Sequence, residues 1–138
     1  MKAATLTSVT LWMRAASGLE VLTGLALVVA PSLLSRLLFG SDLNAAGDAV
    51  GRVAGLVMIC LAAAAWPRES SEPQALIAVA ALSWLAPVFL FAFGVWGGSI
   101  GLLLWPAAAL HFMLALMLTR AWMYASAARQ KWQSGSSP

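Results

Sequence analysis

Hydrophobic residues along the chain gather into four long runs, separated by polar or turn-forming residues. A helix that crosses a membrane needs about 20 consecutive apolar residues, and each run is close to that length. The expected spans are Thr7–Ala30, Asp48–Trp66, Gln74–Trp96 and Ser99–Thr119. The pattern predicts an all-α fold, an integral membrane four-helix bundle in one domain over residues 1–124, with a polar tail over residues 125–138.

Prolines and the first connection refine this pattern. Pro31 follows the first run and Pro67 follows the second, and proline cannot continue a helical hydrogen-bond ladder. The connection between the first two spans is rich in leucines that share one helical face, namely Leu33, Leu34, Leu37 and Leu38. This spacing suits a short amphipathic helix in the membrane interface. A loop that caps the end of the bundle is the alternative.

The composition excludes a soluble globule. Of the 138 residues, 62% are hydrophobic and only 9% are charged, whereas a soluble domain carries about 25% charged residues. The net charge of +3 comes from scattered basic residues without a dense patch, so nucleic-acid binding is excluded as a function class. The single cysteine, Cys60, excludes an internal disulfide, and the sequence has no constellation of metal ligands.

The distribution of Lys and Arg predicts the orientation, because cytoplasmic loops carry an excess of them. Five basic residues fall on the side that holds both termini, namely Lys2, Arg68, Arg120, Arg129 and Lys131. The opposite side has only Arg36. We therefore expect a multi-pass protein of the cytoplasmic (inner) membrane with both termini in the cytoplasm. Arg14 and Glu20 interrupt the first apolar run, which favours a retained helix over a cleaved signal peptide.

Three glycines in the second span form the most specific packing motif. Gly47, Gly51 and Gly55 repeat every four residues and share one narrow face. Membrane helices associate through close backbone approach at such faces. The repeat predicts that a helix packs tightly here. The partner is either another helix of the same chain or a second copy in a homodimer.

Ionisable residues inside a membrane span are costly, by about 2.5–3.5 kcal/mol at the centre, and so are candidates for function. The rise per residue places Glu20 roughly 15 Å from the outer end of its span and His111 roughly 18 Å from the start of its own. Ser83 reaches a similar depth, and Pro87 removes the donor that the Ser83 carbonyl would normally have. These residues predict a polar layer near the midplane. It is either a proton or ligand-headgroup site or a structural hydrogen bond between helices.

A second candidate lies near the outer mouth of the second span. Asp48 and Arg52 are four residues apart with the acid first, the favoured order for a helical ion pair. A local salt bridge is one interpretation, and an arginine that contacts an anion at a pocket entrance is the other.

Several motifs in the first half of the chain resemble the DoxX-like superfamily of small four-helix bacterial membrane proteins. They are Arg14-xxx-Gly18, Pro31, the segment Leu37-Leu38-Phe39-Gly40, and Gly51-Arg52. Some members are associated with quinone-linked oxidoreductases, so the resemblance implies a partner in a membrane redox complex and a quinone as the ligand.

The small multidrug resistance family is a second comparison, because it also has four helices and a lone glutamate in the first. The long first connection and the asymmetric basic residues count against it. The sequence as a whole favours a non-enzymatic structural or accessory protein without a cofactor of its own, the alternative being a proton-coupled transporter that uses Glu20 as its proton site.

Overall fold

The computed structural model of the protein describes residues 2–67, 73–97 and 99–134. They contain the helices α1 (Lys2–Val29), α2 (Pro31–Phe39), α3 (Ala45–Ala64), α4 (Pro73–Trp96) and α5 (Leu104–Ser134). Among these described helices α1, α3, α4 and α5 are long and apolar enough to cross a membrane. The predicted all-α bundle is confirmed, and the chain is a small multi-pass membrane protein whose outer side chains contact lipid.

The first connection contains a helix, α2, which is one of the two alternatives that the leucine pattern left open. Pro31 opens this helix, where its missing N–H costs nothing. Gly40 ends it in the left-handed region, with φ of 72°, and its N–H donates to the carbonyl of Arg36. The next helix, α3, begins after Asn44, whose side chain accepts a hydrogen bond of 2.8 Å from the N–H of Gly47. These caps set the angle between α2 and α3.

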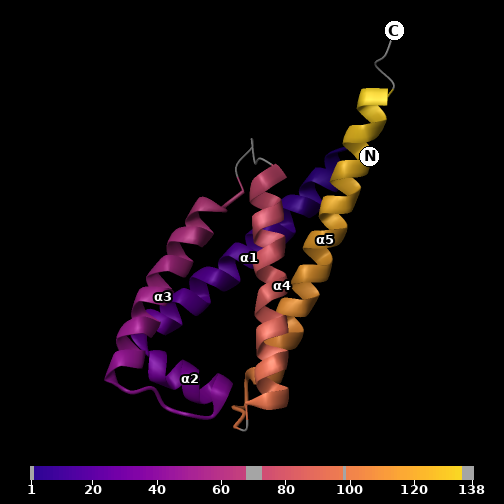
Figure 1. The fold of residues 1–138 in the computed structure, drawn as a ribbon. Coiled ribbons are helices and arrows are strands. Elements are labelled where there is room, and N and C mark those ends of the chain that lie inside the picture. Colours follow the sequence, from indigo (N-terminus) through magenta and orange to yellow (C-terminus); the bar gives the residue numbers. More distant parts are fainter. Residues whose placement is uncertain (1, 68–72, 98, 135–138) are drawn as a thin grey trace.

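The long helices are arranged in two pairs, α1 with α3 and α4 with α5 (Figure 1). Helix α1 runs diagonally, so that its C-terminal half lies on α3 and its N-terminal half reaches α5. Helix α2 lies across the end of the α1–α3 pair (Figure 1). Within the described residues, α3 has no close contact with α4 or α5. The two pairs therefore diverge, and α1 lies behind the opening between them.

The glycine face of α3 packs inside the chain, on α1. A Cβ added to Gly55 would lie 2.5 Å from the carbonyl oxygen of Gly24, and one added to Gly24 would lie 2.7 Å from the carbonyl oxygen of Gly55. Gly51 meets the ring of Pro31 in the same way, at 2.8 Å. Gly47 differs from the expectation, because its neighbours are Leu43 and Asn44 of its own N-cap. The close approach that the repeat predicted therefore rests on Gly51 and Gly55, and this face is occupied within the chain.

The α4–α5 pair packs through large side chains. Near α2, the buried residues Leu90, Leu104 and Ala108 form a cluster that Phe39 of α2 and Phe93 border. At the other end, Leu118 packs with Met13 and Ala16 of α1, and Val79 and Ala80 of α4 lie against them. This second cluster joins α1, α4 and α5 and sets their register.

The last span begins later and continues further than expected. Residues 99–103 are not part of α5, because they cross the end of α2, where helix carbonyls lack donors. The N–H of Gly101 donates to Leu38 at 3.0 Å, and the N–H of Leu103 donates to Leu37 at 2.8 Å. At the other end α5 runs to Ser134, so most of the expected polar tail is helical. Arg68 and the rest of the expected polar turn lie outside the described residues.

Candidate functional site

One face of α1 carries the candidate site. Met13, Ser17, Glu20 and Gly24 follow one another at three- and four-residue steps, so they share a face. The ends of this stripe are packed, because Met13 lies on Leu118 of α5 and Gly24 lies on α3. Ser17 and Glu20 lie between them, where α1 passes from one helix pair to the other. The polar atoms of the stripe therefore face the region between the pairs.

Glu20 has no hydrogen-bonding or ion-pairing partner in the part of the chain that the structure describes. Its side chain is half-buried, and within the described residues its carboxyl group has no hydrogen bond or ion pair. His111 of α5 lies near enough to interact electrostatically with Glu20. The expected hydrogen bond between these two residues is not formed, and the structure brings them together as electrostatic neighbours only.

Ser17 is the functional candidate that the sequence did not single out. The residue is 1% exposed, and its hydroxyl oxygen is buried without a hydrogen-bond partner. A serine inside a helix ordinarily donates to the carbonyl four residues earlier, as Ser83 does to Val79 at 2.7 Å. A buried hydroxyl without a partner costs about 1–3 kcal/mol. Its only sequence signal is its position on the face of Glu20.

His111 is fixed by its own helix. Its Nδ1 lies 2.8 Å from the carbonyl oxygen of Ala107, and a carbonyl can only accept a hydrogen bond, so Nδ1 carries the proton. The Nε2 atom of the neutral ring then has a free lone pair. The residue as a whole is half-buried.

The register of the helices places Ser83 in the same region. Met13, Val79 and Leu118 share one layer of the core. One turn nearer to α2, about 5.4 Å along each helix, come Ser17, Ser83 and Ala115, all buried. The next turn brings Glu20, Pro87 and His111. The Ser83 hydroxyl bonds within α4, while its carbonyl lacks the donor that residue 87 would ordinarily supply.

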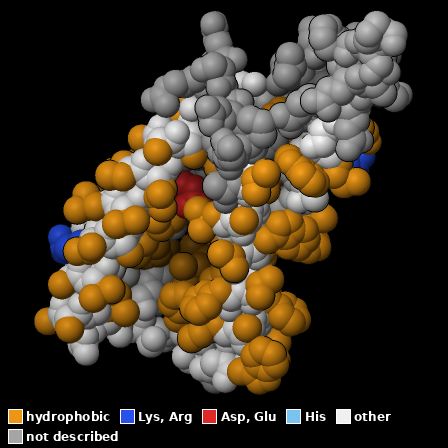
Figure 2. Space-filling view, turned by 45° about the horizontal axis from the view of Figure 1, so that its top comes forward, with side chains coloured by type: hydrophobic (Ala, Val, Ile, Leu, Met, Phe, Trp, Pro, Cys, Tyr) orange, Lys and Arg blue, Asp and Glu red, His pale blue; other side chains and the backbone are white. Residues whose placement is uncertain are grey.

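A hydrophobic hollow opens over this region. Figure 2 shows the hollow between the two helix pairs, with hydrophobic side chains on its walls and an acidic group visible inside it. Its walls come from α3 and α4, which do not touch each other within the described residues. A half-buried carboxyl group in an apolar hollow can bind the polar end of a largely apolar molecule.

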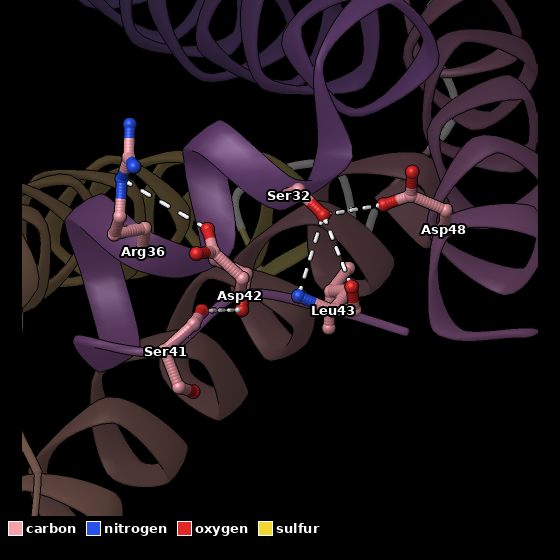
Figure 3. A network of polar contacts seen from close by, with 7 residues as sticks. Ser32, Arg36, Ser41, Asp42, Leu43 and Asp48 are labelled. Atoms are coloured by element: carbon pink, nitrogen blue, oxygen red, sulfur yellow. Dashed lines mark hydrogen bonds and ion pairs between the residues drawn. The ribbon is translucent and has the colours of Figure 1, made fainter. Parts of the chain in front are cut away.

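The second candidate, Asp48 with Arg52, has a structural role for its acid. The Ser32 hydroxyl donates to Asp48 at 2.7 Å and accepts from the N–H of Leu43 at 3.3 Å (Figure 3). The interpretation as an Asp48–Arg52 salt bridge is wrong for the described structure, in which Arg52 is exposed and Asp48 has turned to Ser32. The folded connection places the Ser32 hydroxyl beside the Asp48 carboxylate. An exposed salt bridge with Arg52 would add little stability.

An ion pair does exist at this corner, between Arg36 and Asp42. The two groups are exposed and 3.9 Å apart (Figure 3). The Ser35 hydroxyl donates to the carbonyl of Ser41 at 2.9 Å. The whole network therefore holds α2 against the start of α3. It leaves the region around Glu20 and His111 as the candidate site.

The chain matches no protein-family model, no curated protein and no solved structure. Across the described residues no three His, Cys, Asp or Glu side chains come together as metal ligands. What can be inferred about function therefore depends on the residues around the hollow.

Proposed function

We propose that the protein is a non-enzymatic accessory protein of the membrane, which holds an amphipathic small molecule between its two helix pairs. The headgroup lies at Glu20 and His111, and the apolar part lies against α3 and α4. The observation that carries this proposal is the carboxyl group of Glu20, which is half-buried inside a membrane span and has no partner among the described residues. A structural polar residue in a membrane would be paired.

The resemblance to the DoxX-like superfamily suggests what such a protein serves. A quinone-linked oxidoreductase in the same membrane would be its partner, and a quinone or its reduced form would be the molecule it holds. A partner subunit has ample surface, since the outer faces of all four spans are apolar. A homodimer through the α3 glycines is disfavoured, because Gly51 and Gly55 already pack on the chain itself.

Proton-coupled transport with Glu20 as the proton site is the second candidate. The unpaired carboxyl group of Glu20 also favours transport, because a carboxyl group that has no partner among the described residues can exchange a proton for a ligand. The two candidates differ in what binding releases. Transport of a hydrophobic cation requires that its binding displaces a proton from Glu20, whereas an accessory ligand holder has no such requirement.

The topology belongs to the proposal as well. We place both termini on the cytoplasmic side of the inner membrane, following the excess of Lys and Arg there. Reporter fusions at the two termini of the full chain test this placement. An external C-terminus would reverse the orientation and leave the site itself unchanged.

The proposed function is tested with the full chain purified in mild detergent. Co-purifying small molecules are identified by mass spectrometry in the wild type, in Glu20→Gln and in His111→Ala. Asp48→Asn is the matched control, since it makes the same carboxyl-to-amide change away from the hollow. We expect an amphipathic molecule that is retained in the wild type and the control and is lost in His111→Ala.

Two results would reject this proposal. A wild-type protein that retains no small molecule, and that both Glu20→Gln and His111→Ala destabilise, would show a structural pair instead. Proton release on addition of a hydrophobic cation, abolished in Glu20→Gln and kept in Asp48→Asn, would favour the transporter.

A further inference from the structure

The polar groups around the hollow are mostly hydrogen-bond acceptors. This follows first from His111, whose Nδ1–H is committed to the carbonyl of Ala107 at 2.8 Å. A neutral imidazole has one donor nitrogen and one acceptor nitrogen. Because Nδ1 is the donor, Nε2 presents a lone pair. A ligand carbonyl, which is itself an acceptor, finds no proton on that nitrogen.

The other groups at this level have the same character. The ionised carboxyl group of Glu20 only accepts hydrogen bonds, and the protonated group keeps an accepting oxygen beside its single O–H; these oxygens have no donor among the described residues. Pro87 has no N–H, so the Ser83 carbonyl is an acceptor without its helical donor. The buried hydroxyl of Ser17 is unpartnered and can accept as well as donate. In a membrane interior no water is at hand to supply the missing donors.

We infer that the hollow takes an amphipathic molecule whose headgroup donates hydrogen bonds, either a hydroxyl group or a protonated amine, in preference to one that only accepts them. This inference deepens the proposed function and rests on it. It changes what the resemblance alone implies, because a quinone presents two carbonyls, whereas its reduced form presents two hydroxyl groups. The site therefore prefers the reduced form.

Matched probes test the preference in the full chain reconstituted in lipid nanodiscs. The first pair is 4-nonylphenol and 4-nonylanisole, which differ in the hydroxyl hydrogen and a methyl group. The second pair is dodecylammonium and dodecyltrimethylammonium, which share the charge and differ in the N–H donors. Binding is measured by isothermal titration calorimetry. We expect the donor of at least one pair to bind about tenfold more tightly than its methylated analogue, which corresponds to one or two net hydrogen bonds.

Substitutions then distinguish the two kinds of donor. Glu20→Gln keeps an acceptor oxygen and removes the carboxylate, so it leaves a hydroxyl preference intact and abolishes an ammonium preference. The double variant Glu20→Leu/His111→Leu removes both preferences. Asp48→Asn, the control at the outer corner, changes neither. Thermal unfolding of each variant confirms that the protein is folded before binding is compared.

The outcomes separate this inference from the proposed function. Equal binding within both pairs, or tighter binding of the methylated analogues, would overturn the donor preference and leave the ligand-holding function standing. No binding of any probe by the folded wild type would overturn both together. A donor preference that survives in the double variant Glu20→Leu/His111→Leu would also overturn the inference, since the acceptors would then lie elsewhere.

Discussion

The α1–α3 pair is joined through its backbones, whereas the α4–α5 pair is joined through large side chains. Gly24 and Gly55 bring two backbones so close that neither position has room for a Cβ. In the other pair, Leu90, Leu104 and Leu118 fill the space, and Trp84 donates a hydrogen bond to Thr119. Apolar side chains gain little from meeting in lipid, so each pair needs a further reason to associate. Close backbone contact provides it in one pair, and interlocking side chains provide it in the other.

The difference predicts how each pair tolerates change. A backbone contact has no free volume, so any added atom must separate the helices. A side-chain contact loses energy in proportion to what is removed. The difference between the two pairs also explains where the hollow lies. Helix α1 packs on α3 at Gly24 and on α5 at Met13. Between these two contacts, around Ser17 and Glu20, the two pairs diverge.

The largest loss of stability is expected from Gly55→Leu. The new side chain would collide with the Gly24 carbonyl and with Leu27, whose Cβ lies 2.9 Å from the position of an added Cβ. We expect the free energy of unfolding to fall by about 3 kcal/mol, at the upper end of the range for overpacking. Thermal or denaturant unfolding in detergent measures it. Gly18→Leu is the control, because an added Cβ at Gly18 has nothing within 4 Å. Equal effects of the two substitutions would contradict the backbone contact.

A smaller loss is expected from Leu104→Ala in the α4–α5 pair. Leu104 of α5 is fully buried in the cluster with Leu90 of α4. Truncation leaves a cavity and should cost about 2–3 kcal/mol. Leu116→Ala on the same helix removes the same atoms from an exposed position and should have little effect. If both variants unfold alike, side-chain packing is not what joins this pair.

The contact of residues 99–103 with α2 gives a third case. A Cβ added to Gly101 would collide with the carbonyl of Leu37, and the N–H of Gly101 donates to the carbonyl of Leu38. Gly101→Ala inserts a methyl group against the end of α2, for an expected loss of about 1–2 kcal/mol. Gly18→Ala is the matched control. An unchanged unfolding curve for Gly101→Ala would mean that α2 is not held by residues 99–103.

Sequence patterns predicted what depends on one helix at a time. Apolar length identified the spans, Pro31 marked the boundary between α1 and α2, and the leucine spacing gave α2 as one of two alternatives. The repeat of Gly51 and Gly55 predicted a close approach, because only a residue without a side chain allows it. Each of these signals is local, because it depends on the residues of one segment.

What depends on two helices could not be read in the same way. The packing partner of Gly55 is Gly24, and the sequence around neither glycine identifies the other as its partner. Asp48 lies one helical turn from Arg52, yet it accepts a hydrogen bond from Ser32. The fold of the connection determines which hydroxyl group comes near it. Nothing in the sequence distinguishes Ser17 from an ordinary helix serine. That its buried hydroxyl lacks a hydrogen-bond partner follows only from the position of α1 between the pairs.

The smallest predicted effect concerns the hydrogen bond between Trp84 and Thr119. The indole N–H donates to the Thr119 hydroxyl at 3.0 Å, and that hydroxyl donates to the Ala115 carbonyl at 2.8 Å. Thr119→Val keeps the shape and removes the acceptor, so the loss should be about 0.6 kcal/mol, the mean for hydrogen bonds between membrane helices.

A double-mutant cycle isolates this hydrogen bond from packing. Trp84→Phe removes the donor and part of the ring, and Thr119→Val in that background should then cost nothing further. Thr119→Ser keeps the hydroxyl and serves as the control. A coupling energy near 0.6 kcal/mol would show that the α4–α5 pair is held mainly by its side-chain packing, with the hydrogen bond as a minor addition. A coupling well above that value would mean that this single polar contact, and not the leucine clusters, distinguishes the pair from the glycine contact of α1 and α3.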